Sequence, residues 1–231
     1  MNRVEHQIGF ILKSQSFKEN SLIHQVFTRD FGLVSILSKG SKATVSKYGS
    51  LLQPFRSLTL SWVGKSDLKT LTSVDERVIL PSLKGRSLYC GFYMNELILN
   101  FFHKHDAHPR LFDMFNMSLT ALSNTENIEA VLRQFEKTLL NEMGYGLALE
   151  YEADNQLPIE PDQYYFYQPG YGAKRENNAQ HPEAILGSTL IHLNNNTLKD
   201  KTELKQAKRL MRRLIDSQLD GKILKSRDLF N

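Results

Sequence analysis

Residues 22–37 read LIHQVFTRDFGLVSIL, and this stretch determines the expected fold of the first part of the chain. Its first half is rich in β-branched and aromatic residues up to Thr28, and Leu33–Leu37 resumes that pattern, which favours strands. Arg29-Asp30-Phe31-Gly32 lies between the two halves, and its glycine allows the positive φ of a tight loop. The stretch therefore predicts two antiparallel strands joined as a hairpin.

Three more strands are expected around this hairpin. Gly9–Leu12 is a short apolar run before it, and residues 57–62 after it alternate between small polar and large apolar side chains. Gly64–Asp67 then turns into a last strand, Leu68–Val74. Five short strands with one long interruption suit a small closed barrel, because closure removes exposed edges. We therefore expect an OB-fold nucleic-acid-binding domain over residues 1–80.

From Pro81 onward the pattern becomes helical, and residues 81–231 are expected to form an α-helical domain, giving an α+β multidomain protein. Three helices, expected to pack on one another, precede an irregular insertion at about 150–182, and a final helix follows it. The predicted helices are Ser87–Phe102, Pro109–Leu122, one from a cap at Asn124 or Thr125 to Gly144 or Gly146, and Asp200–Leu219. The insertion is expected to hold one strand that ends in a tight turn, with one helical turn at Pro182–Gly187.

Lysine and arginine are unevenly distributed along the chain. The formal net charge is +4, but residues 1–80 carry +5, residues 81–198 carry −6 and residues 199–231 carry +5. Segregated basic segments attract a polyanion that the whole-chain average would barely attract. Ordinary solvated surfaces also carry blocks of charge, so charge alone leaves both interpretations open. The last helix, with its basic residues facing outward, is a secondary basic surface.

The segment Lys39–Gly49 is the most suggestive of a nucleic-acid contact. It places three lysines, an aromatic residue and flanking glycines between two strands of the expected barrel. Lysines in such a position neutralise backbone phosphates, and exposed aromatics stack on bases. The predicted DNA-binding residues are Lys39, Lys42, Lys47, Tyr48, Arg56, Lys65 and Lys69. Phe55 and Trp62, on apolar stretches, are assigned to the core.

Nucleotide hydrolysis and nucleophilic catalysis find little support. Gly40-Ser41-Lys42 lacks the preceding glycine of a phosphate-binding loop, and Gly221-Lys222 is followed by isoleucine where a Mg²⁺-binding hydroxyl is needed. The single cysteine, Cys90, excludes an intramolecular disulfide and any zinc site built from several thiolates, and it is expected to be packed inside a helix. We expect a binding protein without catalytic residues or a cofactor.

His103, His105 and His108 form a cluster that could ligate a metal, but they lie at a helix end without a distant partner at ligand spacing. Histidines at such positions commonly complement the helix dipole or meet water. The N-terminal residues lack the basic head and apolar stretch of a signal peptide, and no run approaches the ~20 apolar residues of a membrane span. The sequence therefore predicts no metal and a cytoplasmic protein.

A series of short motifs, in order along nearly the whole chain, resembles the bacterial recombination mediator family RecO. The motifs are Phe31-Gly32-Leu33-Val34, Ser38-Lys39-Gly40, Leu52-Gln53-Pro54-Phe55, Leu68-Lys69-Thr70-Leu71, Leu88-Tyr89, Tyr93-Met94-Asn95-Glu96-Leu97, Leu132-Arg133-Gln134-Phe135-Glu136, Leu139-Leu140, Gly144-Tyr145-Gly146, Ala207-Lys208-Arg209 and Lys225-Ser226-Arg227-Asp228-Leu229-Phe230. No single motif is decisive, and the ordered set carries the resemblance.

That resemblance implies an N-terminal OB-fold and a helical C-terminal domain. It also implies binding of single- and double-stranded DNA, annealing of complementary strands, and transfer of strands coated with single-stranded DNA-binding protein to the RecA recombinase. The implied partners are RecR and the acidic C-terminal tail of the single-stranded DNA-binding protein. Many members carry a four-cysteine zinc module where this chain has Glu150–Gln180, and this chain departs from that pattern completely. We therefore expect a degenerate module without zinc.

The family's tail-binding site is a hydrophobic pocket with basic residues on the helical domain, and the resemblance carries Arg133 over to that role. An acidic tail with an apolar end needs a guanidinium beside an apolar groove, and Arg133 adjoins the apolar positions Leu132 and Phe135. Lys137, one turn further along the helix, is a second candidate. On its own, the same pattern also fits an ordinary solvated helix arginine.

The sequence thus predicts a non-enzymatic mediator of DNA repair and homologous recombination, a monomer when alone and associated with the nucleoid. Two other functions stay open. One is an OB-fold factor that binds RNA. The other is a protein-interaction adaptor whose basic ends contact acidic partners and do not bind nucleic acid.

Overall fold

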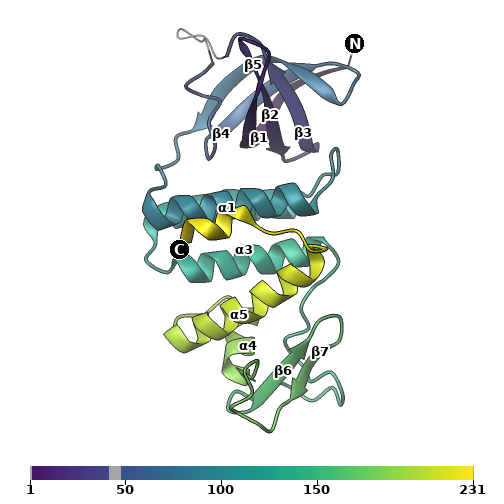
Figure 1. Cartoon of the computed structure of the whole chain (residues 1–231), viewed down its shortest axis with the longest axis vertical. Helices are drawn as coiled ribbons and strands as arrows, with labels where there is room; N and C mark the ends of the chain where they lie inside the picture. The colour runs from purple at the N-terminus through teal and green to yellow at the C-terminus, as the bar shows by residue number, and fades with distance from the viewer. Residues whose placement is uncertain (1, 42–47, 231) are drawn as a thin grey trace. The chain divides into compact units, whose positions relative to one another are not determined.

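The computed structural model describes residues 2–41 and 48–230 (Figure 1). By its internal contacts the chain divides into two units. Unit 1 comprises Met1–Asn124 and Leu224–Asn231, and unit 2 comprises Thr125–Ile223. Unit 2 is therefore inserted between two parts of unit 1 in the sequence.

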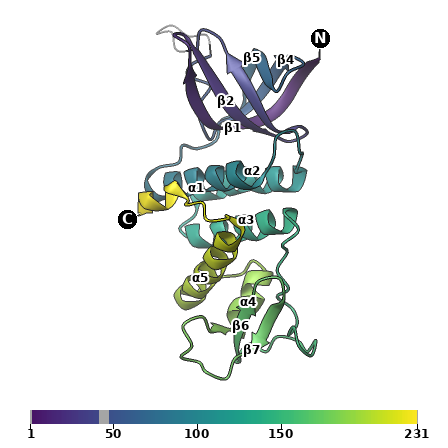
Figure 2. The ribbon, with the colours of Figure 1, turned by 45° about the vertical axis from the view of Figure 1, so that its right-hand side comes forward.

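Unit 1 contains the predicted barrel. Its strands are β1 (Arg3–Phe17), β2 (Ser21–Thr28), β3 (Gly32–Ser38), β4 (Ser57–Val63) and β5 (Leu68–Val78). They close in the order β1-β2-β3-β5-β4, and β3 and β5 run parallel while the other neighbours are antiparallel (Figure 1 labels the strands, and Figure 2 shows the barrel from another side). The expectation of a five-stranded OB-like barrel followed by helices is confirmed.

Strand β1 pairs with both of its neighbours and changes partner at Gly9. This residue faces Thr28 of β2 and Leu58 of β4. A Cβ atom on Gly9 would lie 3.0 Å from the side chains of both Leu60 and Val26. Glycine therefore permits the close approach of strands at the corner where β1 closes the barrel.

The barrel core is built from apolar side chains of all five strands and of the segment before β4. Its fully buried members are Ile11, Val26, Val34, Ile36, Leu52, Leu58, Leu60, Trp62 and Val74. Trp62 is 2% exposed, which confirms its assignment to the core. Phe55 is half-buried outside this cluster, where its ring meets Phe92 with centroids 5.1 Å apart.

A chain of hydrogen-bonded polar side chains joins β1, β2 and β3 at one end of this core. Ser14 Oγ lies 2.7 Å from His24 Nδ1, and His24 Nε2 lies 2.8 Å from Ser38 Oγ. Ser38 Oγ lies 2.6 Å from Ser41 Oγ. His24 is 1% exposed, and burial lowers the pKa of its imidazole to about 4. The imidazole is therefore neutral near pH 7.

This buried imidazole predicts a loss of stability in mild acid. Because the pKa of His24 falls from 6.5 to about 4 on folding, protons bind the unfolded chain first as the pH decreases below 6.5. Stability from this group is complete above pH 6.5 and decreases towards pH 4. Between about pH 8 and pH 5, wild type should lose about 2 kcal/mol of unfolding free energy more than His24→Gln does. Urea unfolding of both proteins at several pH values measures the difference, and parallel pH profiles would contradict it.

Helices α1 (Gly85–Phe101) and α2 (Pro109–Asn124) pack against the barrel. Phe10 and Phe27, on β1 and β2, meet the rings of Phe112 and Phe115 on α2, with centroids 5.3–6.2 Å apart. On α1, Asn95 donates from Nδ2 to the backbone carbonyl of β1 residue 12, at 2.9 Å. Both helices therefore share a core with the barrel.

The C-terminal 3₁₀-helix η1 (Lys225–Phe230) also belongs to unit 1. The Glu96 carboxylate on α1 accepts hydrogen bonds from the backbone N–H groups of Lys225 and Ser226 and from the Ser226 hydroxyl, at 2.6–2.9 Å. The division by contacts thus falls after residue 124, whereas the predicted boundary falls after residue 80, because two helices and η1 pack with the barrel. That residues 1–80 fold as a domain alone stays a prediction.

Unit 2 contains the remaining elements. They are α3 (Ile128–Glu142), β6 (Tyr164–Gln168), β7 (Gly172–Arg175), β8 (Ile185–Leu186), α4 (Gly187–Asn194) and α5 (Lys201–Gln218). The cap of α3 is Asn127, whose side chain accepts from the Ala130 N–H, so the helix begins after the predicted caps Asn124 and Thr125. Residues 182–187, expected as one helical turn, include β8 instead, and β8 pairs with β6. The helix turn was predicted wrongly because a two-residue strand leaves almost no periodic pattern.

A buried polar network holds the insertion that lacks cysteines. Glu152 is 3% exposed and accepts hydrogen bonds from the Arg175 guanidinium, at 2.7 and 3.0 Å, and from the side chains of Tyr165 and Asn155. Burial alone would raise the pKa of Glu152, but these hydrogen bonds hold it below its usual value. Arg175 also pairs with Glu160 at 2.7 Å. Ion pairs therefore crosslink the segments that flank β6 and β7.

Cys90 is 1% exposed within α1, which confirms that its thiol is packed in a helix. Within the described residues, no helix combines the length and the apolar character that crossing a membrane requires.

Candidate nucleic-acid interface

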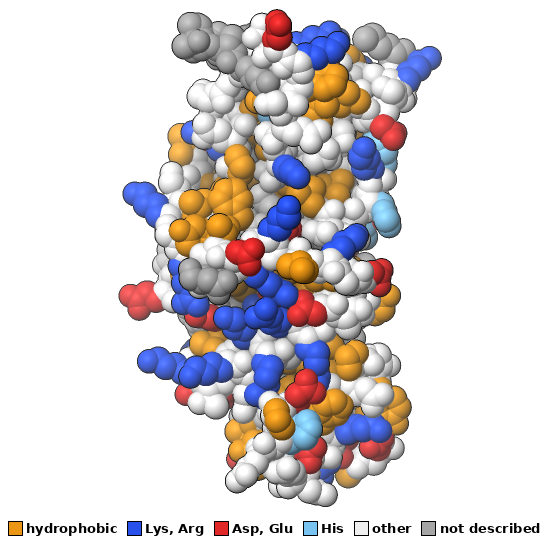
Figure 3. Space-filling view, viewed as in Figure 1, with side chains coloured by type: hydrophobic (Ala, Val, Ile, Leu, Met, Phe, Trp, Pro, Cys, Tyr) orange, Lys and Arg blue, Asp and Glu red, His pale blue; other side chains and the backbone are white. Residues whose placement is uncertain are grey.

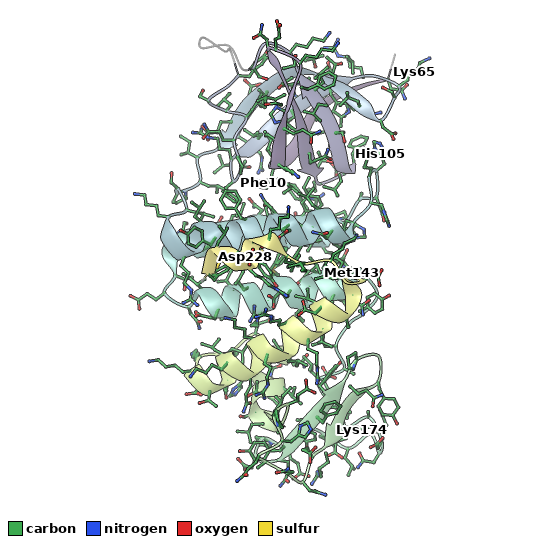
Figure 4. The ribbon with its side chains drawn as sticks, viewed as in Figure 1. Phe10, Lys65, His105, Met143, Lys174 and Asp228 are labelled. Carbon is green, nitrogen blue, oxygen red and sulfur yellow. The ribbon has the colours of Figure 1, made fainter. Side chains whose placement is uncertain are left out.

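Three of the predicted lysines lie on or beside the neighbouring strands β3 and β5. Lys39 follows β3, Lys65 lies in the turn between β4 and β5, and Lys69 is the second residue of β5. Lys69 faces Ile36 in the parallel β3–β5 register, and Lys39 lies three residues beyond Ile36, roughly 10 Å further along the strand. Lys39 and Lys65 are exposed and Lys69 is half-buried. Figure 3 shows Lys and Arg side chains at the barrel end drawn uppermost, and Figure 4 labels Lys65 there.

Tyr48 lies beside β5, level with Lys39. Its hydroxyl oxygen is 3.5 Å from the Thr72 carbonyl oxygen, and its ring packs against the barrel core while staying half-buried. Leu37 pairs with Thr70, so continuing the register places Lys39 level with Thr72 as well. The structure thus brings an aromatic ring and a lysine together beside β5. This combination matches what single-stranded nucleic acid requires, namely a cation for the phosphate and a ring for the base.

Arg56 lies apart from these lysines. It precedes β4, whereas Lys65 follows that strand, so the two lie at opposite ends of β4. The Arg56 guanidinium pairs with the Glu76 carboxylate at 2.9 Å, which partly neutralises its charge. Lys42 and Lys47 lie outside the described residues. Of the seven predicted DNA-binding residues, Lys39 and Tyr48 lie level with Thr72 of β5, Lys69 lies nearer the start of that strand, and Lys65 lies in the turn before it. These four residues with Lys18 (below) are called the barrel face.

Lys18 was missed by the sequence analysis. It lies in the β1–β2 turn, and because Leu22 pairs with Ser38, this turn and Lys39 lie at the same end of the β2–β3 ladder. OB-folds bind oligonucleotides through the loops between strands 1 and 2 and between strands 4 and 5, and here those loops carry Lys18 and Lys65. If the first strand had been predicted to extend beyond the apolar run Gly9–Leu12, the β1–β2 loop and Lys18 within it would have been identified.

The three histidines do not form a metal centre. His105 Nε2 lies 3.6 Å from Asp67, and His108 Nε2 lies 3.3 Å from Asp106. In the part of the chain that the structure describes, no group of three or more His, Cys, Asp or Glu side chains is placed to hold a metal ion. The segment instead ties the α1–α2 connection to β3, where the His105 N–H donates to the Leu33 carbonyl at 3.0 Å.

The comparisons with known proteins agree with this architecture. A family model described as Recombination protein O N terminal matches residues 1–76, and one described as Recombination protein O C terminal matches residues 83–228. The chain belongs to the RecO family. It is 41% identical to the DNA repair protein RecO of Thiobacillus denitrificans, over 98% of this chain and 91% of that relative. It is 40% identical to the RecO of Nitrosococcus oceani, over 98% and 93% of the two chains.

In this RecO family member, Arg133 and Lys137 already have partners within unit 2. Arg133 is 5% exposed and its Nη2 lies 2.5 Å from the Glu136 carboxylate. Lys137 donates from Nζ to the carbonyls of Leu193 and Asn194 at the end of α4, and burial lowers its pKa. The Arg133 guanidinium is therefore buried and paired, and it is not the solvated helix arginine that the pattern alone would also fit. The tail-binding role of both residues stays a prediction.

Proposed function

We propose that this RecO family protein is a non-enzymatic mediator of DNA repair and homologous recombination. It binds single- and double-stranded DNA, anneals complementary strands and, with RecR, helps to load RecA onto strands coated with single-stranded DNA-binding protein. The observation that carries this proposal is the position of Lys39, Lys65, Lys69 and Tyr48 along strand β5 of a closed OB-like barrel. The protein acts in the cytoplasm, at the nucleoid.

The barrel face supports binding that does not depend on base sequence. Lysines neutralise phosphates and release counterions, which gives affinity that falls steeply with salt. A tyrosine ring stacks on any base, because every base has a π-face. Strands held through their phosphates keep their Watson–Crick edges available, so a second strand can pair with them. This is the physical basis of annealing without turnover chemistry.

We place the acidic C-terminal tail of single-stranded DNA-binding protein at α3. Arg133 supports this placement because its Nε is buried without a hydrogen-bond acceptor among the described residues. A buried donor without an acceptor costs free energy, so a tail carboxylate that accepts a hydrogen bond from Nε recovers that free energy on binding.

The tail proposal predicts that α3 variants lose affinity for the tail peptide and keep their affinity for DNA. Replacing Arg133 alone removes the cation facing buried Glu136, at a cost of about 3–5 kcal/mol of stability. The double variant Arg133→Leu with Glu136→Leu removes both charges and should stay folded. We expect it to bind an acidic tail peptide at least tenfold more weakly, with unchanged single-strand affinity. Fluorescence anisotropy with a labelled peptide measures this, and unchanged peptide affinity would show that the tail binds elsewhere.

A competition experiment tests the proposed function against the two alternatives. Labelled single-stranded DNA is bound to the full chain, and unlabelled DNA or RNA of the same sequence is added. If the protein is a DNA mediator, unlabelled DNA displaces the labelled strand more readily than unlabelled RNA does. Preference for RNA would favour an RNA-binding factor, which recognises the 2′-hydroxyl. Negligible affinity for both, with affinity kept for the acidic peptide, would favour an adaptor.

A further inference from the structure

Helix α5 of unit 2 has one apolar and one basic face. Asp200 caps it by accepting from the backbone N–H groups of Thr202 and Glu203, at 2.7 and 3.2 Å. Its buried residues are Ala207, Leu210, Met211, Leu214 and Ile215. The apolar side is therefore fixed in the core of unit 2, and the opposite side faces solvent.

The solvent side carries a row of basic residues, here called the α5 stripe. Its members are Lys201, Lys205, Lys208, Arg209 and Arg212, and all five are exposed. Their spacing of three to four residues places them along one side of the helix, over about 16 Å from first to last. Figure 3 shows Lys and Arg side chains gathered over α5.

The α5 stripe is weakly neutralised by the described residues. Arg212 Nε lies 3.9 Å from Asp216, and Arg209 donates to the Ala184 carbonyl. Between residues 204 and 215 the helix has no acidic residue. Helix α3 differs, because it alternates acidic and basic side chains.

Such a row is unfavourable for the isolated protein. Like charges three or four residues apart on a helix destabilise it by about 0.2–0.5 kcal/mol per pair. The Lys201–Lys205, Lys205–Arg209 and Lys208–Arg212 pairs are all of this kind. A polyanion laid along the helix would remove this repulsion and release its own counterions. The stripe therefore has the character of a polyanion-binding surface.

The absence of aromatic residues distinguishes the α5 stripe from the barrel face. Helix α5 contains no Phe, Tyr or Trp, whereas the barrel face has Tyr48 beside its lysines. Single-strand sites combine cations with stacking rings, so a face with cations alone suits a ligand whose bases are already stacked on each other. A duplex presents one phosphate per about 3.4 Å of each strand, so about five phosphates lie along the length of the stripe. The five basic residues match that number.

We propose that the α5 stripe binds the phosphate backbone of double-stranded DNA, independently of sequence. This inference rests on the proposed function and assigns its duplex-binding activity to unit 2. Single strands are bound by the barrel face, and the annealed product is held by α5.

The test uses the full chain and compares two sets of substitutions with equal loss of charge. The stripe variant carries Lys205→Gln, Lys208→Gln and Arg212→Gln. The control carries Lys84→Gln, Lys222→Gln and Lys225→Gln, which are exposed residues outside both faces. Affinities for a duplex and for a single strand of about 20 nucleotides are measured by anisotropy over a range of salt concentrations. Circular dichroism confirms that both variants are folded.

For the stripe variant, we expect the slope of log K against log salt concentration for duplex binding to flatten by about 2.7. We expect its duplex affinity at 0.1 M salt to decrease on the order of 100-fold. Its single-strand affinity should stay within about twofold of the control. Equal duplex affinities of the two variants would overturn the inference. Polyglutamate serves as a third ligand. If the stripe variant lost affinity for polyglutamate and kept its affinity for the duplex, the inference would also be overturned, and the stripe would be assigned to an acidic protein. If wild type bound duplex and not single strands, the proposed function would fail while the inference stood.

Discussion

Replacing Lys39, Lys65 and Lys69 together by glutamine is expected to lower the affinity for single-stranded DNA by about 100-fold at 0.1 M salt. Each phosphate contact on a single strand contributes about 0.7 to the logarithmic salt slope, so three lost contacts flatten that slope by about two units. The effect is large because the three lysines lie along the adjacent strands β3 and β5, so that one DNA strand laid across them contacts all three. Anisotropy titrations of a labelled oligonucleotide at several salt concentrations give both quantities.

The control for this prediction is the variant with Lys84, Lys222 and Lys225 changed to glutamine, which loses the same charge elsewhere. Its single-strand slope should equal that of wild type. If both variants lost affinity equally, net charge would account for binding and the barrel face would not. Adding Lys42→Gln and Lys47→Gln to the barrel variant tests the two predicted lysines that lie outside the described residues. A further fall in slope would place them in the interface.

Gly32→Ala is expected to lower the unfolding free energy by about 2–5 kcal/mol. Gly32 has a φ of +62°, which costs a residue with a Cβ about 1–2 kcal/mol. A Cβ atom there would also lie 1.9 Å from the Asp106 carbonyl oxygen, so the α1–α2 connection must move away from the barrel. Displacing a packed backbone adds about 1–3 kcal/mol.

Gly85→Ala is the matched control, because Gly85 also lies in unit 1, has a φ of +50° and has nothing within 4 Å of the added Cβ. It carries the backbone strain without the clash. Urea unfolding followed by tryptophan fluorescence is a suitable measurement, since Trp62 is the single tryptophan and lies in the barrel core. A Gly32→Ala variant as stable as Gly85→Ala would mean that the α1–α2 connection does not press on the barrel.

Much of the barrel could be predicted from alternation alone, because its strands bury one face in the barrel core. The covering of its outer surface by helices was also encoded, in a less regular form. Phe10 and Phe27 interrupt the alternation with a second apolar side, which is typical of strands buried on both faces. This second apolar side explains why α1 and α2 belong to unit 1 by their contacts.

The candidate site was only partly predictable, because charge and spacing do not reveal ion pairs between distant segments. Nothing in the sequence pattern indicates that Arg56 is less available for DNA than Lys65, yet Arg56 pairs with Glu76, twenty residues further along the chain. Lys18 was overlooked because the exposed end of β1 carries polar side chains and gives no strand signal. Arg133 had a local signal, since an acidic residue three positions later on a helix is a natural ion-pair partner.

Annealing of complementary DNA strands coated with single-stranded DNA-binding protein tests the mediator account most directly. The strands are coated either with the intact protein or with a form that lacks its acidic C-terminal tail, and the appearance of duplex is followed after this chain is added. The account predicts rapid annealing of strands coated with the intact protein and at least tenfold slower annealing of strands coated with the tailless form. It also predicts that naked strands are annealed. Equal rates on the two coated forms, or no annealing of naked strands, would contradict it.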